Sequence, residues 1–213
     1  MLLRALLALG LVVTLTGCGD DSSGSGIAHD DGAVVREAPT DVTTPEGPRS
    51  LEEDFLVVEG VWWLGTDYPR VTSPSGNRLL WSGGRSGLWI SVPGLYGLWP
   101  VRLDVRRTEP RVPRWCEDVV EAPYEHHGDE LRMGSFETTS DPLPLAAGSY
   151  RVRLCATGLD AAATEEEFDG EEYHVYSSRH LIQVWPAPAA PERVLREGSR
   201  WARDSRISST SSR

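Results

Sequence analysis

Apolar and polar residues alternate in the second half of the chain, and this pattern predicts a pair of β-strands. The segment 149–156 has apolar side chains at Tyr150, Val152 and Leu154, alternating with Arg151, Arg153 and Cys155. A period of two is typical of a strand with one buried face and one solvated face. The segment 179–185 is also apolar and ends at Pro186, which cannot donate a ladder hydrogen bond. With the acidic run 164–172 between them, the two segments predict an antiparallel hairpin with a long tip.

This pairing also predicts which side chains are buried. The expected core residues are Val152 and Leu154, facing Leu181 or Ile182 and Val184 or Trp185. Arg151 and Arg153 are expected in solvent, because a slip of one residue would place both charges inside. On a solvated face, truncating Arg153 to Ala costs under about 0.5 kcal/mol.

Short apolar runs separated by Gly and Pro predict further strands upstream. They lie in the ranges 55–64, 78–81, 88–92, 98–106, 115–122 and 131–136. About eight short strands at this spacing indicate an all-β domain, and we predict an antiparallel β-sandwich. Most of the tryptophans fall in or beside these runs, where core packing is their expected role.

The N-terminus has the features of a secretion signal. Arg4 precedes an apolar stretch, 5–13, that is too short to span a bilayer. The sequence Leu15-Thr16-Gly17-Cys18 then resembles the lipobox of bacterial lipoproteins. The resemblance implies cleavage after a signal peptide of residues 1–17 and attachment of lipid to Cys18, which anchors the chain on the extracytoplasmic face of the cell membrane. The alternative is an ordinary secretory signal with an incidental cysteine.

Composition divides the remaining chain into three parts. Residues 18–50 are rich in Gly, Ser, Asp, Thr and Pro and predict a disordered tether with a reach of about 30 Å. Residues 51–187 contain the predicted strands and form the expected β-sandwich domain. Residues 188–213 form a polar tail, with a short helix within 191–204 as one option.

The formal net charge is -11, and all 21 basic residues are arginine. A chain this acidic is not expected to bind nucleic acid through its overall field, whereas a basic protein or a cation remains a possible partner. Cys116 and Cys155 form an even pair in an exported domain, which suggests a disulfide. Such a bridge would destabilise the unfolded chain by about 4 kcal/mol. Two free buried thiols are the alternative.

Two polar clusters contain ligand-type side chains. His126, His127, Asp129 and Glu130 are weak candidates for a zinc site, because zinc ligands are usually spaced so that they converge. A solvated turn is the preferred interpretation. The acidic loop consists of Glu165, Glu166, Glu167, Asp169, Glu171 and Glu172. It lacks the alternating spacing of a calcium loop, and a charged hairpin tip that hinders aggregation is the preferred interpretation.

Motifs for catalysis are weak. We find no Gly-x-Ser-x-Gly elbow, and the Gly-rich segment 83–87 lacks the Lys-Ser/Thr pair of a phosphate loop. The sequence therefore implies no cofactor and no catalytic residues, and the protein is not expected to be an enzyme.

The segments 148–162 and 181–188 resemble a family of actinobacterial β-rich proteins with no assigned activity. In that family a Tyr-Arg-Val-Arg strand leads to a Gly-x-Asp turn, an acidic stretch and a closing strand that ends in Gln-x-Trp-Pro-Ala. Residues 115–121 are similar to an upstream segment of the same family. The shared motifs are structural, so the resemblance implies no functional residue.

Three functions remain open. The preferred hypothesis is a membrane-anchored, extracytoplasmic lipoprotein whose domain binds an unknown ligand, or an envelope or secreted protein, without catalysis. The second is an inhibitor or immunity-type protein for a basic partner, which the charge and the acidic loop favour. The third is a metal-dependent hydrolase built on His126 and His127.

Overall fold

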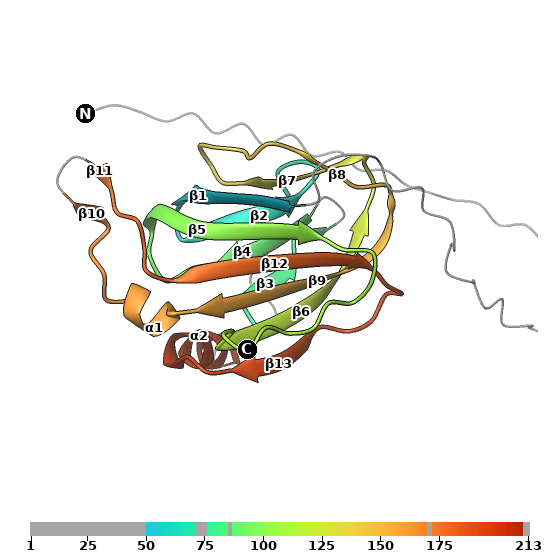
Figure 1. The fold of residues 1–213 in the computed structure, drawn as a ribbon. Helices are drawn as coiled ribbons and strands as arrows, with labels where there is room; N and C mark the ends of the chain where they lie inside the picture. Colours follow the sequence, from blue (N-terminus) through green and yellow to red (C-terminus); the bar gives the residue numbers. More distant parts are fainter. Residues whose placement is uncertain (1–49, 71–75, 85–86, 170–171, 211–213) are drawn as a thin grey trace, which may run out of the picture. The chain divides into compact units, whose positions relative to one another are not determined.

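The computed structural model describes residues 50–70, 76–84, 87–169 and 172–210. The predicted signal peptide, Cys18 and almost all of the predicted tether lie outside the described residues. The described chain is dominated by β-strands, and Figure 1 shows that the sheet they form is curled. Apolar side chains from these strands form the main core. No helix in this part of the chain has the length and apolar character needed to cross a membrane.

Within the described ranges, eleven strands form one sheet. Its main path is β13 (Arg193–Glu197), β6 (Asp118–His126), β9 (Gly148–Thr157), β12 (Arg179–Pro186), β5 (Tyr96–Val105), β1 (Ser50–Val58), β2 (Val61–Gly65), β4 (Gly87–Ser91) and β3 (Leu80–Ser82). Beside this path, β7 (Glu130–Gly134) pairs with β2 and with β8 (Leu143–Pro144). Within the sheet, β12 and β5 run parallel, whereas the other described pairs are antiparallel.

The prediction of a β-rich fold is confirmed, but the predicted antiparallel sandwich is wrong. The strands belong to one mixed sheet that curls until β3 and β4 lie against β6, in the manner of a half-barrel. The parallel contact between β5 and β12 explains the difference. It joins two segments that are far apart in the sequence, and local patterning carries no information about such a pairing.

The predicted hairpin is confirmed. β9 and β12 pair antiparallel in a register that places Val152 beside Val184 and Leu154 beside Ile182. All four side chains are buried in the main apolar cluster. Between the two strands lie α1 (Leu159–Ala162) and a small separate hairpin of β10 (Phe168–Asp169) and β11 (Glu172–Tyr173).

Tryptophans lie on both sides of the curled sheet. Trp62 and Trp99 are fully buried in the main core. Trp63, Trp89 and Trp81 occupy one row across β2, β4 and β3 and form a separate cluster. These five side chains are at least 95 per cent buried, with exposures between 0% and 5%, which agrees with the packing role expected from the sequence.

The expected solvated face of β9 is in fact buried. Arg151 and Arg153 are 3% and 1% exposed, and both bind Glu121 of the neighbouring strand β6, which is 0% exposed. The Nε atoms of the two arginines donate to the Glu121 carboxylate at 3.0 Å and 2.8 Å. Arg193 of β13 donates to the same carboxylate at 2.5 Å. The prediction that Arg151 and Arg153 are solvated is therefore wrong, and the small cost expected for truncating Arg153 no longer follows.

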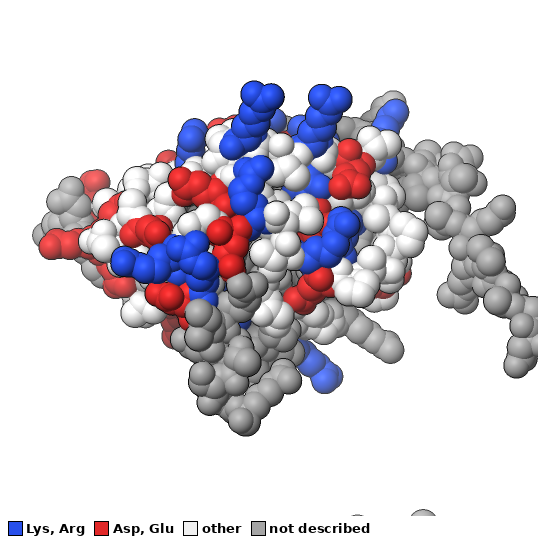
Figure 2. Space-filling view, turned by 90° about the horizontal axis from the view of Figure 1, so that it is seen from below, with Lys and Arg blue, Asp and Glu red and all other residues white. Residues whose placement is uncertain are grey.

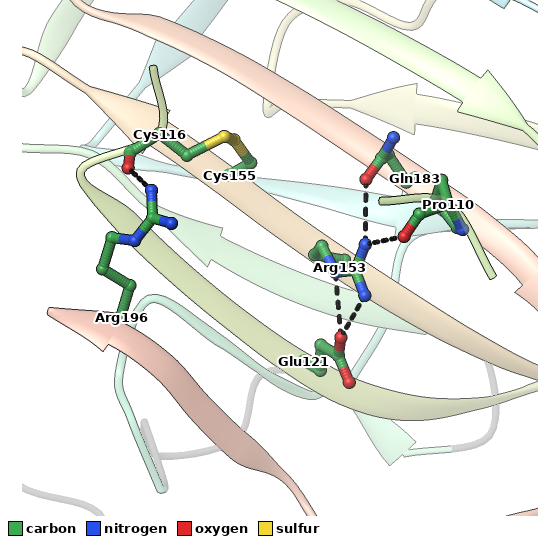
Figure 3. Close-up of a disulfide and its surroundings, with 7 residues drawn as sticks. All are labelled: Pro110, Cys116, Glu121, Arg153, Cys155, Gln183 and Arg196. Atoms are coloured by element: carbon green, nitrogen blue, oxygen red, sulfur yellow. Dashed lines mark hydrogen bonds and ion pairs between the residues drawn. A yellow bond between two sulfur atoms is a disulfide. The ribbon is translucent and has the colours of Figure 1, made fainter. Parts of the chain in front are cut away.

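A connecting segment covers this outer face. Residues 106–117, here called the strap, leave the end of β5 and cross β12 and β9 before β6 begins. Arg153 donates from Nη1 to the carbonyl oxygen of Pro110 at 2.6 Å, and its guanidinium lies 4.8 Å from the ring centroid of Trp185. Figure 3 shows Arg153 between Glu121, Gln183 and Pro110. The sequence contains both arginines but does not indicate that a distant segment folds over them.

A disulfide joins the strap to the sheet. Cys116 and Cys155 are bridged with a Cα–Cα distance of 5.5 Å, consistent with the pairing suggested by the sequence. Both cysteines are buried beside Val119 and Leu181, and Arg196 donates to the carbonyl oxygen of Cys116 (Figure 3). The strap is therefore held at Pro110 and at Cys116.

The sheet also extends beyond residue 187, where the polar tail was predicted to begin. β13 pairs with β6, with a register shift between Val194 and Arg196. It is followed by α2 (Arg200–Thr210), and two carboxylates bind the backbone at the start of this helix and at the two residues before it. Asp118 accepts from the backbone N–H groups of Gly198 and Ser199, and Asp160 accepts from those of Arg200 and Trp201.

Candidate functional site

The acidic loop lies on a projecting arm. We use this name for residues 165–177, which contain β10 and β11 and extend from one end of the sheet in Figure 1. Figure 2 shows acidic side chains gathered at that same end of the molecule. The arm is fastened to the beginning of β5, because the backbone N–H of Leu98 donates to the carbonyl oxygen of His174 at 2.8 Å.

Two of the predicted acidic residues have structural partners. Glu165 binds His174 at 2.6 Å and also accepts from the backbone N–H and the hydroxyl of Ser177. Burial tends to raise the pKa of Glu165, but the hydrogen bonds from Ser177 and His174 outweigh it and lower the pKa overall. Glu167 accepts from the backbone N–H of Leu95 at 2.9 Å.

The other acidic residues of the loop are Glu166, Asp169, Glu171 and Glu172. Glu166 and Glu172 are exposed. For Asp169 the structure describes the backbone, and Glu171 lies outside the described residues. Within the described ranges, no three His, Cys, Asp or Glu side chains lie close enough together to hold a metal ion.

The arm also exposes apolar side chains that the sequence analysis missed. Leu95, Tyr173 and Val175 are 55%, 39% and 48% exposed. They belong to two adjacent segments, since Val175 forms a parallel bridge with Leu98 and Leu95 is bound by Glu167. We call these three residues, with Glu166, Glu167 and Glu172, the arm face. Tyr173 and Val175 stand out in a polar stretch, and this was the available signal in the sequence.

The predicted zinc residues do not converge. His126 points into the domain, where its Nδ1 atom lies 2.8 Å from the Tyr124 hydroxyl and burial lowers its pKa. The adjacent His127 is exposed. Glu130 instead forms an ion pair with Arg132 at 2.7 Å, and Asp129 is exposed. The interpretation as a solvated turn therefore holds for His127 and Asp129, whereas His126 is a buried residue at the end of β6.

Two of the hollows at the surface of the described part of the domain bear on catalysis. The first, ≈ 630 Å³, lies between β3–β4 and β6–β9 and has His127, Glu125 and Ser149 among its lining residues. The second, ≈ 450 Å³, lies on the outer face of β1, β5 and β12 and is lined by residues that include Trp115 and Arg179. Neither lining combines a nucleophile with a hydrogen-bonded base and a group that orients that base, the arrangement that nucleophilic catalysis needs.

Comparisons with known proteins add little. No protein-family model matches this chain, and no curated protein sequence is significantly similar to it. One similar solved structure is ComJ from Bacillus subtilis, an inhibitor of the DNA-degrading activity of NucA, with 10% identity and a TM-score of 0.46 over 65% of this chain and 95% of ComJ. Another is the product of crocagin biosynthetic gene J, with 14% identity and a TM-score of 0.40 over 64% of this chain and 97% of that protein. Similarities of this size establish neither a family nor a shared partner.

Proposed function

We propose that this protein is a lipid-anchored, extracytoplasmic lipoprotein whose β-domain binds another protein without catalysis. The lipobox at Leu15–Cys18 supports the anchor, and the disulfide between Cys116 and Cys155 is compatible with an oxidising compartment. The predicted tether, residues 18–50, gives the domain room to reach a partner near the membrane.

The observation that carries the binding function is the arm face. An exposed apolar centre with a charged rim is the usual anatomy of a protein interface, and aromatic residues such as Tyr173 are enriched in such centres. The rim carries Glu166, Glu167 and Glu172, so the complementary partner is a basic protein surface. An inhibitor or immunity-type protein for a basic enzyme is one form of this function.

The metal-dependent hydrolase is the weaker candidate. His126 is buried against Tyr124 while His127 faces solvent, so the two imidazoles do not share one site. Nothing among the described residues favours this activity over binding.

The anchor is tested by Cys18→Ala. The variant is expected to lose lipid, to remain unprocessed by lipoprotein signal peptidase and to keep the mass of the precursor. Detergent-phase partitioning together with intact-mass spectrometry measures this. A variant that is processed and partitions like the natural protein would show that the lipobox assignment is wrong.

The binding surface is tested by site-specific photo-crosslinking in cells. A crosslinking amino acid at Tyr173 is expected to capture a defined protein with a basic surface. The same probe at Leu195 of β13, which is 44% exposed, serves as the matched control. Equal capture at both positions would count against the arm face as the binding surface.

Charge is tested separately. Reversing Glu166 and Glu172 to Arg should abolish capture at low salt, whereas reversing Glu125 and Glu130 should leave it nearly unchanged, although both pairs change the net charge equally. Unchanged capture after reversal of Glu166 and Glu172 would rule out a basic partner surface. It would not rule out binding through the apolar residues of the arm face.

A further inference from the structure

In the part of the chain that the structure describes, the strap carries arginines without an ion pair, although the chain as a whole is acidic. Arg107, Arg111 and Arg114 are exposed, and among the described residues none of the three has a carboxylate partner. A fourth arginine, Arg179 of β12, is likewise exposed and without an ion pair in the described chain. Figure 2 shows basic side chains projecting along one edge of the domain, away from the acidic end.

Both acidic side chains of the strap itself have hydrogen-bond partners. Glu109 binds the buried Arg153 at 2.9 Å, and Glu117 accepts from the backbone N–H of Gly158 at 2.9 Å. Asp104, almost fully buried, is shared by Arg102 and Arg106. Of the strap charges that form no ion pair within the described residues, three are positive and one, that of Glu117, is negative, so the local field of the strap opposes the net charge of -11.

An aromatic side chain stands among these arginines. Trp115 is 42% exposed, and the guanidinium carbon of Arg179 lies 5.4 Å from its ring centroid. Its position is rigid because the next residue, Cys116, is bridged to β9. An exposed tryptophan beside arginines is chemically suited to a lipid–water interface, where the indole enters the headgroup region and the guanidinium groups contact phosphates.

We propose that the strap docks the domain onto a lipid surface that contains anionic phospholipid. This inference rests on the proposed lipid anchor. The net charge of the chain opposes binding from free solution, but a tether with a reach of about 30 Å holds the strap at high effective concentration near the membrane. Each arginine near an anionic surface shifts the ratio of docked to undocked domain about fivefold.

The test couples the mature chain, residues 18–213, to vesicles through Cys18. This is the one free thiol among three cysteines, since Cys116 and Cys155 are bridged, and it reacts with a maleimide-headgroup lipid. The vesicles contain brominated acyl chains, which quench indoles that enter the interface. One set contains phosphatidylcholine alone and the other also contains phosphatidylglycerol.

Docking predicts stronger quenching on the anionic vesicles, and high salt should reverse it. Replacing Arg111 and Arg114 with Gln should lower the docked-to-undocked ratio about 25-fold, at about fivefold for each arginine. The matched control, Arg70→Gln with Arg200→Gln, removes the same charge from exposed positions and should leave quenching unchanged. Trp115→Phe should remove most of the quenchable signal.

Three outcomes would overturn the proposal. They are equal quenching on both kinds of vesicle, an equal loss of quenching in the control variant, and binding of soluble polyphosphate without any quenching by anionic vesicles. The last would assign the strap to a soluble polyanion. Because the maleimide replaces the natural lipid, failure of Cys18 lipidation in cells and failure of strap docking are separate results.

Discussion

The two faces of β9 are buried by different chemistry. On the inner face, Val152 and Leu154 pack into an apolar core, where dispersion and the hydrophobic effect provide the stabilisation. On the outer face, Arg151 and Arg153 are just as buried but surround the carboxylate of Glu121. Burial alone therefore does not show which kind of interaction holds a strand in place.

The difference lies in how each face responds to a lost group. An apolar contact is non-directional, so a truncated core side chain leaves a cavity that the surroundings partly fill. A buried charge depends on particular partners, and removing one leaves the others desolvated and uncompensated. Burial raises the pKa of Glu121, but hydrogen bonds from Arg193, Arg151 and Arg153 outweigh it and hold the pKa below its ordinary value.

The largest expected effect comes from the outer face. Glu121→Gln keeps the shape of the side chain but removes the buried counter-charge of Arg151 and leaves Arg153 with only the exposed Glu109, and should lower the free energy of unfolding by about 3–5 kcal/mol. Urea denaturation measures this, with the exposed Glu125→Gln of the same strand as the control. Equal effects of the two substitutions would show that the buried ionic cluster contributes nothing specific.

Leu154→Ala tests the inner face of the same strand. The substitution should lower the free energy of unfolding by about 2–5 kcal/mol, because Leu154 is 2% exposed and packs in the main core. The same denaturation experiment applies. High salt should change neither this effect nor that of Glu121→Gln very much, since solvent ions do not screen buried groups well.

Acid should destabilise the folded domain through His180 of β12, whose side chain is buried. This residue is 3% exposed, neither ring nitrogen has a hydrogen-bond partner within the described residues, and burial lowers its pKa to about 4. The unfolded chain binds the proton first, so stability present above pH 6.5 is lost as the pH falls toward 4. The loss amounts to about 3 kcal/mol.

His180→Leu should remove this pH dependence and leave stability at neutral pH unchanged or higher, because the imidazole nitrogens have no protein partners to lose. Denaturation curves of the two proteins between pH 7 and pH 4 provide the measurement. Subtracting them cancels the titration of Glu53 and Asp118, which lie in the same row of the sheet. Parallel stability profiles would argue against His180 as the source.

The smallest effect is expected for a half-exposed arginine. Arg102 binds Asp104 at 2.9 Å and Glu52 at 3.5 Å, and its own side chain is 48% exposed. Arg102→Gln should cost under about 1 kcal/mol, because Arg106 still pairs with the buried Asp104, and high salt should reduce the cost further because the Arg102 guanidinium is solvated. A cost as large as that of Glu121→Gln would show that exposure does not separate the two kinds of arginine.

The candidate surfaces were predicted unevenly. The acidic loop was visible as a charge run, and Cys116 and Cys155 were visible as an even pair of cysteines. The sequence did not show that Leu95 belongs to the arm face. Leu95 meets the arm through its hydrogen bond to Glu167, which joins positions far apart in the sequence. Arg107 and Arg111 of the strap have no ion pair within the described ranges, and Glu109 between them binds the buried Arg153 instead, which the sequence does not indicate.

The sequence by itself determined the local structure. The alternation from Tyr150 to Leu154 defined a strand with an apolar face, and its pairing with residues 179–185 followed from adjacency in the chain. Only the tertiary structure decided that β5 joins β12 in parallel, that the sheet curls instead of dividing into two layers, and that the strap covers Arg153. The physical reason is that side-chain alternation reports which residues share a face, whereas burial of that face depends on what a distant segment packs against it.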